Sequence, residues 1–204
     1  MLFEDAYKTI EQISEGLFKS KGSRFIAFAL PVKNEIEVKA HLKELRKKYH
    51  DARHYCYAYR LGFAKSVYRM NDDGEPSGTA GRPIYGQIIS KDLTNILVVV
   101  IRYFGGTKLG VSGLINAYKT AAKEALNNAI IISKTINDVY EIEFGYEEMN
   151  NVKKIMRESN LNQIFQIFEL KCKIKFEVRK RDSNLVFEKF SRINNLKINY
   201  LHTV

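Results

Sequence analysis

The chain has 204 residues, of which 45% are apolar and 27% are charged, and its formal net charge at pH 7 is +10. This apolar content suffices for one good core or for two small ones. The longest purely aliphatic run, residues 96–101, is far too short to cross a bilayer, which excludes a membrane-spanning chain.

Cysteine usage and the amino-terminal residues predict a cytoplasmic protein. Cys56 and Cys172 lie far apart in the sequence and fit neither a metal-binding nor a disulfide spacing. A reducing compartment is the simplest interpretation. Glu4 and Asp5 stand where a signal peptide has basic and then apolar residues, so we expect no secretion signal.

Charge and glycine are distributed unevenly along the chain. Residues 137–204 contain 12 basic and 10 acidic residues, whereas residues 1–136 contain 21 basic and 13 acidic ones. Every glycine except Gly145 lies at or before Gly113. We therefore predict two domains, residues 1–136 and residues 137–204, of which the first attracts polyanions more strongly.

The first domain is predicted to mix strands and helices. Residues 10–18 and 24–32 form a strand pair around a turn at residues 20–23, and Asn34 with Glu37 caps the helix that follows. The remaining elements are a strand at 54–62, a short strand near Val67, a helix starting near Pro83, a central strand at 95–104 and a helix capped by Ser112.

The second domain has a clear βαββαβ pattern, which predicts a ferredoxin-like fold and makes the whole chain an α+β protein. Strands are expected at residues 140–146, 161–168, 170–179 and 196–200, with helices at 149–156 and after Asp182. Leu170 begins the third strand, in which apolar and charged residues alternate. This alternation places the aromatic residues Tyr140, Phe144 and Phe176 under the helices and Glu141, Glu143, Lys171, Lys173 and Lys175 in solvent, unlike an RNA-recognition motif.

A glycine-rich loop follows the central strand of the first domain. Residues 101–113 lead from an apolar strand through Gly105, Gly106 and Gly110 into a patterned helix. Glycines allow close backbone approach, and a helix N-terminus offers unpaired N–H groups to an anion. Val111 stands where a nucleotide-triphosphate hydrolase loop has lysine, so we expect phosphate binding of another kind.

Four sequence blocks together resemble the IMPACT/YigZ family: residues 21–27, 54–60, 71–83 and 101–113. The resemblance covers essentially the whole chain, including a carboxy-terminal region that many bacterial members carry. It implies a first domain similar to the second domain of a small-subunit ribosomal protein and a last domain similar to that of elongation factor G. It also implies translation control, because eukaryotic relatives compete for an activator of a stress-response kinase.

Several basic side chains are candidates for one anion site near the glycine-rich loop. His54 and Arg60 share a strand face, and Arg24 and Arg102 end neighbouring strands, so we expect these donors to converge. The candidate phosphate-binding residues are Arg24, His54, Arg60, Arg102, Tyr103, Gly105, Gly106, Thr107, Lys108, Gly110, Ser112 and Gly113.

The acidic loop before the second helix has two interpretations. Asp72, Asp73 and Glu75, with Thr79 and Arg82 nearby, either bind a hard cation such as magnesium or serve as turn residues. We favour turn chemistry, and therefore no metal or other cofactor.

Two further groups on the 54–60 strand also have alternative roles. His54 and Cys56 share a face and are either a base and nucleophile pair or, as we favour, a histidine beside a buried thiol. Tyr55, Tyr57 and Tyr59 share the other face, where they either stack bases or, as we favour, form core.

The sequence as a whole predicts a non-enzymatic regulator of translation that associates with RNA or the ribosome. It assigns no catalytic residue and leaves the oligomeric state open. One alternative is a metal-dependent phosphoester hydrolase or another enzyme acting on nucleotides. The other is a protein-interaction module whose basic face binds an acidic partner in translation control.

Overall fold

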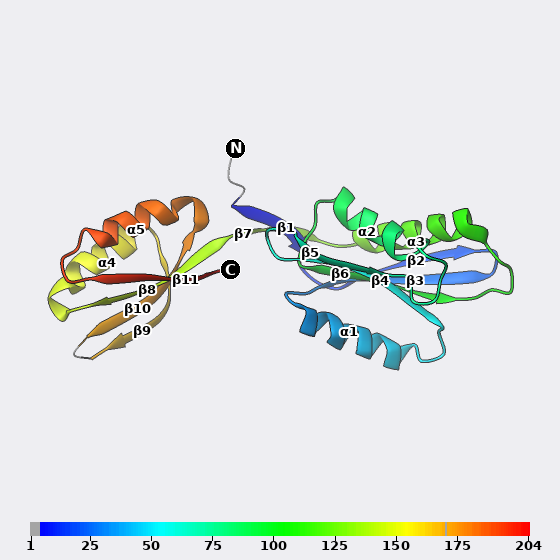
Figure 1. Cartoon of the computed structure of the whole chain (residues 1–204), viewed down its shortest axis with the longest axis horizontal. Coiled ribbons are helices and arrows are strands. Elements are labelled where there is room, and N and C mark those ends of the chain that lie inside the picture. The colour runs from blue at the N-terminus through cyan, green and yellow to red at the C-terminus, as the bar shows by residue number, and fades with distance from the viewer. Residues whose placement is uncertain (1–4, 170) are drawn as a thin grey trace. The chain divides into compact units, whose positions relative to one another are not determined.

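The computed structural model describes residues 5–169 and 171–204, so Glu4 and Leu170 lie outside the described residues. The chain forms two compact units (Figure 1). One is Tyr7–Lys134, and the other joins residues 5–6 to Thr135–Val204. Both units mix helices and strands, which confirms the predicted α+β, two-domain class.

The first unit contains a five-stranded sheet with helices on both faces. Its strands lie in the order β2 (Ser14–Ser20), β3 (Ser23–Pro31), β6 (Ile96–Tyr103), β4 (His54–Leu61) and β5 (Val67–Asn71), and all neighbours are antiparallel. Helix α1 (Glu35–Lys48) covers one face, and α2 (Gly81–Ser90) and α3 (Gly110–Asn127) cover the other (Figure 1).

The central strand β6 is buried on both faces, more completely than its apolar sequence predicts. Ile96, Val98 and Val100 belong to the core under α2 and α3. Residues 97, 99 and 101 belong to the core under α1. Because successive side chains of a strand alternate between faces, this assignment also decides where the last two residues of β6 lie. Arg102 faces α2 and α3, and Tyr103 faces the side of α1.

The helix ends agree with the sequence in one case and differ in two. Asn34 accepts a hydrogen bond from the Glu37 backbone N–H at 3.0 Å, which confirms the predicted cap of α1. The predicted cap of α3 by Ser112 is wrong, because the chain turns at Gly110 with a φ of 74° and the helix has already begun there. Asp182 precedes its helix but makes no side-chain cap bond.

A small second sheet joins distant parts of the first unit. Strand β1 (Ala6–Ile10) pairs with β7 (Ile131–Thr135), a strand that the sequence pattern does not predict. The predicted strand at residues 10–18 is accordingly interrupted, since β1 ends at Ile10 and β2 begins at Ser14. The Ser14 hydroxyl donates to the carbonyl of Ala125 at 2.8 Å, so this break anchors the sheet to α3.

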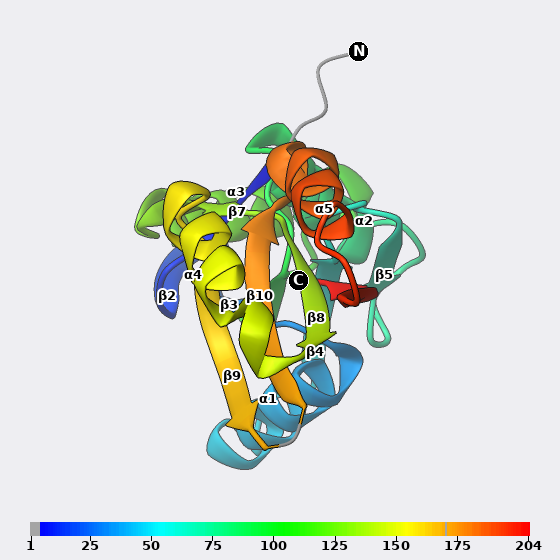
Figure 2. The ribbon, with the colours of Figure 1, turned by 90° about the vertical axis from the view of Figure 1, so that its left-hand side faces the viewer.

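The second unit has the predicted ferredoxin-like βαββαβ order. Its strands β8 (Asn137–Phe144), β9 (Asn162–Phe168), β10 (Cys172–Arg179) and β11 (Lys197–Thr203) form an antiparallel sheet in the order β11-β8-β10-β9. Helices α4 (Met149–Glu158) and α5 (Ser183–Ser191) are led in by short 3-10 turns, Tyr146–Glu148 and Lys180–Asp182. Figure 2 shows both helices on one face of this sheet, with β9 at its edge.

The two faces of this second sheet confirm the predicted alternation. Tyr140, Phe144 and Phe176 are buried in the core under α4 and α5. On the other face Glu143 pairs with Lys171 at 3.0 Å and with Lys173 at 3.3 Å, and Glu141 pairs with Lys175 at 3.5 Å. These opposed charges form a solvated face and not a platform for stacking bases. Among the helices of the described residues, none is long and apolar enough to span a membrane.

Candidate functional site

The glycine-rich loop after β6 is held against the turn between β2 and β3. The Gly105 backbone N–H donates to the Ser23 hydroxyl at 3.1 Å. A side chain on Gly105 would overlap the backbone of Gly22 and Ser23, and Gly22 itself has a φ of 78°. Glycine is therefore needed on both sides of this contact, which fixes the loop beside the turn.

Beyond Gly105 the loop exposes backbone donors. Gly106, Thr107 and Lys108 are all exposed, and their N–H groups have no hydrogen-bond acceptor within the described part of the chain. The next residues open α3, whose first-turn N–H groups have no partner inside the helix and no side-chain cap at Leu109. A helix start of this kind favours an anion.

The turn that meets this loop is basic. A cavity of about 500 Å³ is lined by residues 19–24 together with Tyr103, and three of its residues are Lys19, Lys21 and Arg24. The Arg24 guanidinium lies 4.8 Å from the centre of the Tyr103 ring. The Tyr103 hydroxyl donates to Asp51 at 2.6 Å, and this hydrogen bond raises the pKa of Tyr103 to about 12. Sequence reasoning overlooked Lys19 and Lys21, whose only signal is their position around Gly22.

Arg102 lies on the other face of the sheet and is already paired. It is 6% exposed, and its Nη1 donates to Glu75 Oε1 at 2.5 Å. The Tyr118 hydroxyl donates to the same oxygen at 2.8 Å. The guanidinium also lies 5.5 Å from the ring centres of Phe25 and Phe104. Arg102 thus contributes to a buried polar cluster, although its Nε has no partner among the described residues.

His54 and Cys56 extend this buried cluster. His54 Nδ1 lies 2.9 Å from the carbonyl oxygen of Asp73, so that nitrogen carries the proton in this contact. Cys56 Sγ lies 2.9 Å from the carbonyl oxygen of Asp72 and 3.3 Å from the Tyr118 hydroxyl. Burial raises the pKa of the Cys56 thiol well above its ordinary range. These contacts agree with a buried thiol and not with a nucleophile.

The acidic loop uses its carboxylates to hold the backbone. Asp72 accepts from the N–H groups of Gly78 and Ala80 at 2.9 Å and of Gly81 at 2.8 Å, and so caps α2 from a distance. Asp73 accepts from the Tyr55 N–H at 2.7 Å and pairs with Arg46 at 3.0 Å.

The other two candidates in this segment are Thr79 and Arg82. The Thr79 hydroxyl donates to the carbonyl of Pro76 at 2.6 Å, and Arg82 is exposed in the first turn of α2. In the part of the chain that the structure describes, no three His, Cys, Asp or Glu side chains gather as a metal ion would need. The contacts favour turn chemistry over a cation site.

The expected convergence of four basic residues is wrong. Arg60 lies at the far end of β4, where it contacts Asp92 at 3.4 Å and the Leu93 carbonyl at 3.3 Å. Six residues of extended strand separate it from His54, which is about 20 Å. Arg24 and Arg102 lie on opposite faces of the sheet, since Arg24 is opposite Tyr103 in the register. Arg24 lies in the turn that contacts the loop through Gly22, whereas His54 and Arg102 are opposite each other on the other face of the sheet.

The tyrosines of β4 belong to the core under α1. Tyr55 and Tyr59 are buried, and Tyr57 packs against the same cluster. The Tyr55 hydroxyl donates to the carbonyl of Tyr49, and the Tyr59 hydroxyl donates to Glu35, both at 2.5 Å. Tyr55 and Tyr59, with covered rings and paired hydroxyls, form core, and Tyr57 stacks on Tyr59 at its margin.

Fold and site together define a two-domain α+β protein with a glycine-rich loop at a helix start beside a basic turn. The model of the Impact N-terminal domain matches residues 21–126, which contain the turn, the acidic loop and the glycine-rich loop. The chain belongs to the IMPACT family.

Individual relatives extend this likeness over most of the chain. IMPACT family member YvyE of Bacillus subtilis (strain 168) is 30% identical over 94% of this chain and 88% of its own length. IMPACT family member YigZ of Escherichia coli (strain K12) is 32% identical over 74% of this chain and 76% of its own length. A solved structure described as that of an hypothetical protein has the same fold, with a TM-score of 0.75 at 24% identity, and covers 98% of this chain and 99% of that one.

Proposed function

We propose that this chain is a non-enzymatic, RNA- or ribosome-associated regulator of translation that binds phosphate groups at the end of its first sheet. The proposed site, here called the basic tip, consists of Lys19, Lys21, Arg24, Lys108 and the backbone N–H groups of residues 106–108. The observation that carries the proposal is the contact between Gly22 and Gly105, which holds the basic turn beside these unpaired donors.

The charge and chemistry of the basic tip suit a polyanion. Residues 1–136 carry 21 basic and 13 acidic side chains, so the surrounding field attracts phosphates. Backbone N–H groups and lysines bind phosphate oxygens without reading bases. Resemblance to the IMPACT family, whose eukaryotic members act in translation control, supports RNA of the translation apparatus as the polyanion.

Enzymatic hydrolysis receives no comparable support from the contacts. Asp72, Asp73 and Glu75 are each engaged by separate protein donors, which leaves no shared metal position for a hydrolytic mechanism among the described residues. The basic tip itself contains no group arranged as a nucleophile with its base. Binding without turnover is therefore the function that the geometry supports best.

Charge reversal at the basic tip tests the proposal. We expect Lys108→Glu and Lys21→Glu each to weaken binding of fluorescently labelled RNA oligonucleotides by roughly five- to tenfold, with equal effects on different sequences. Lys123→Glu is the matched control, because Lys123 is also exposed but lies about 20 Å further along α3. Fluorescence anisotropy measures all three. Equal losses in the control and the test variants would show a general charge effect and contradict the proposed site.

A further inference from the structure

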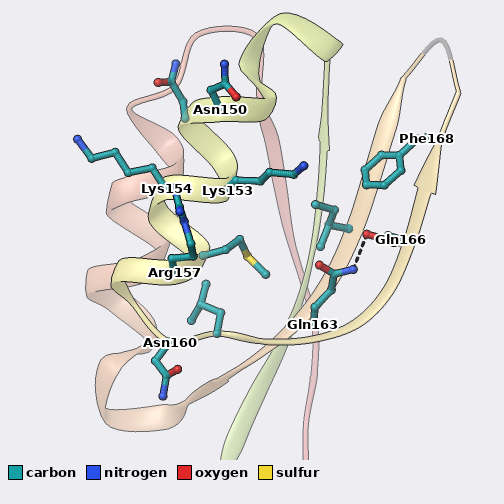
Figure 3. Close-up of a pocket in the computed structure, with 12 residues that line it drawn as sticks. Asn150, Lys153, Lys154, Arg157, Asn160, Gln163, Gln166 and Phe168 are labelled. Atoms are coloured by element: carbon teal, nitrogen blue, oxygen red, sulfur yellow. Dashed lines mark hydrogen bonds between the residues drawn. The ribbon is translucent and has the colours of Figure 1, made fainter.

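A groove between α4 and β9 in the second unit has apolar walls and basic side chains at its opening. It encloses about 810 Å³, and Met156, Leu161, Phe168 and Ile174 provide its apolar surface. Figure 3 shows Lys153 reaching from α4 toward β9, while Lys154 points away from the strand. None of the described residues that line the groove is acidic.

Strand β9 is an unprotected sheet edge. Among the strands of the described residues it pairs with β10 alone, and all seven of its residues are exposed. Its sequence contains no charged residue and no proline, although sheet edges commonly carry them to prevent pairing with other chains. A register shift near Phe176 interrupts the pairing once, after which residues 165–168 continue regularly. Apolar side chains here are 38% to 50% exposed, among them Ile167 and Ile164.

The charge around this edge is unbalanced on the side of α4 only. On the outer face Lys171, Lys173 and Lys175, which lie beside β9, are paired with Glu141 and Glu143. On the α4 side Lys153 and Arg157 are exposed, and neither forms an ion pair with any described residue. The groove therefore presents positive charge beside a strand edge whose backbone N–H and C=O groups can still pair with another strand.

We propose that the free edge of β9 binds an extended, acidic peptide segment of a partner protein as a fifth strand. Main-chain hydrogen bonds along residues 165–168 supply affinity, as in other strand-addition complexes. Because peptide side chains alternate between faces, every second one enters the groove. An apolar side chain there contacts Met156 and Leu161, and acidic neighbours two residues away reach Lys153 and Arg157.

Single-stranded nucleic acid fits this edge less well. The two phenylalanines of β9 lie on opposite faces, since Phe165 is opposite Lys175 and Phe168 is opposite the buried Cys172. Only one ring therefore faces the groove, which is too few to stack successive bases. The backbone N–H and C=O groups of an edge strand are also matched in spacing by those of another peptide backbone, with which they form hydrogen bonds.

A second copy of this chain is likewise disfavoured by charge. The segment that it would offer, Asn162–Phe168, is neutral and brings no acidic side chain to Lys153 or Arg157. Pairing two such edges would also bring together two copies of the same basic helix. Charge complementarity thus points to an acidic partner, and this inference is independent of the basic tip.

Synthetic peptides and the full-length chain test the proposal. The probe is a fluorescein-labelled heptapeptide with the sequence Thr-Glu-Thr-Ile-Thr-Glu-Thr, in which the second, fourth and sixth residues share the face that enters the groove. Its binding is measured by anisotropy. We expect this peptide to bind and the same peptide with lysine in place of glutamate not to bind. Methylating alternate backbone nitrogens should weaken binding by on the order of tenfold or more, because it removes the main-chain donors.

Protein variants locate the site. Lys153→Glu and Arg157→Glu should each weaken binding of the acidic peptide by about tenfold. Lys197→Glu is the control, since Lys197 is an exposed lysine on β11 at the opposite edge of the same sheet, and it should change affinity less than about twofold.

Four results would overturn the proposal. Equal affinity of the methylated and unmethylated peptides would exclude strand addition. Unchanged binding by Lys153→Glu would exclude the groove. A twelve-nucleotide uridine oligomer that competes for this groove, or a dimer in sedimentation velocity that Lys153→Glu dissociates, would assign the edge to RNA or to a second copy instead.

Discussion

Arg102 and Tyr103 are neighbours at the end of β6, yet they belong to regions of opposite character. Arg102 lies under α2 and α3, where Glu75 neutralises its charge and the Tyr118 hydroxyl donates to the same Glu75 oxygen. Tyr103 lies on the other face beside Arg24, next to the cavity lined by the basic turn. In the first region the positive charge is neutralised by a carboxylate of the protein, whereas in the second region the positive charge is available to a ligand. A basic residue in a family motif can therefore belong to the scaffold that holds a site and not to the site itself.

The largest expected effect comes from breaking the buried pair. Glu75→Gln leaves the Arg102 guanidinium buried without a counter-charge, so we expect the free energy of unfolding to fall by about 3–5 kcal/mol. Urea denaturation monitored by circular dichroism measures the loss. Glu124→Gln, at an exposed position on α3, should change stability by less than about 0.5 kcal/mol. A loss below about 1 kcal/mol in Glu75→Gln would mean that the pair is not structural.

A smaller loss is expected when the remote cap of α2 is removed. Asp72→Ala deletes the acceptor for three backbone N–H groups and should cost about 2 kcal/mol. Asp182→Ala is the matched control, since Asp182 also precedes a helix but makes no cap bond there, and it should cost less than about 0.5 kcal/mol. Equal losses in the two variants, by thermal or urea unfolding, would contradict the capping role of Asp72.

The smallest effect concerns Tyr103, on the face of the first sheet that lies beside Arg24. Because Asp51 accepts a hydrogen bond from Tyr103, the folded-state pKa of Tyr103, about 12, lies above its ordinary value of 10.0. This contact therefore stabilises the fold below pH 10, and its contribution is lost as the pH rises from 10 toward 12. Asp51→Asn should lower the pKa of Tyr103. Absorbance titration at tyrosinate wavelengths, with Tyr103→Phe as the subtraction, measures it, and an unchanged midpoint would exclude this hydrogen bond as the cause.

Local patterns in the sequence predict most of the fold. Asn34 and Glu37 predict the start of α1 because a cap depends only on neighbours three residues apart. The alternation around Phe176 predicts both faces of the second sheet for the same reason. Strand β7 is not predicted by the sequence pattern, because its partner β1 is more than a hundred residues away and its own residues are mostly exposed.

The site is predictable only in part, since its members meet through tertiary contacts. The glycine-rich loop is visible in the sequence, but the pairing of Arg102 with Glu75 spans 27 residues and reverses the role expected of Arg102. Arg60 shares the strand face of His54 yet lies at the other end of the strand. In the sequence Lys21 looks like an ordinary surface lysine, because it is brought to the site only by the tertiary contact between Gly22 and Gly105. The spacing of residues in a sequence shows which face of a strand each one lies on, whereas its neighbours in space are known only from the tertiary structure.

The most direct test of the central claim is the salt dependence of RNA affinity for the unaltered chain. If the basic tip and its surroundings contact four to six phosphates, the plot of log K against log salt should have a slope of roughly −3 to −5. The double variant Lys21→Glu/Lys108→Glu should reduce the magnitude of that slope by about 1 to 2, because two phosphate contacts are lost. A flat response, or an identical slope in the variant, would contradict phosphate binding at the basic tip.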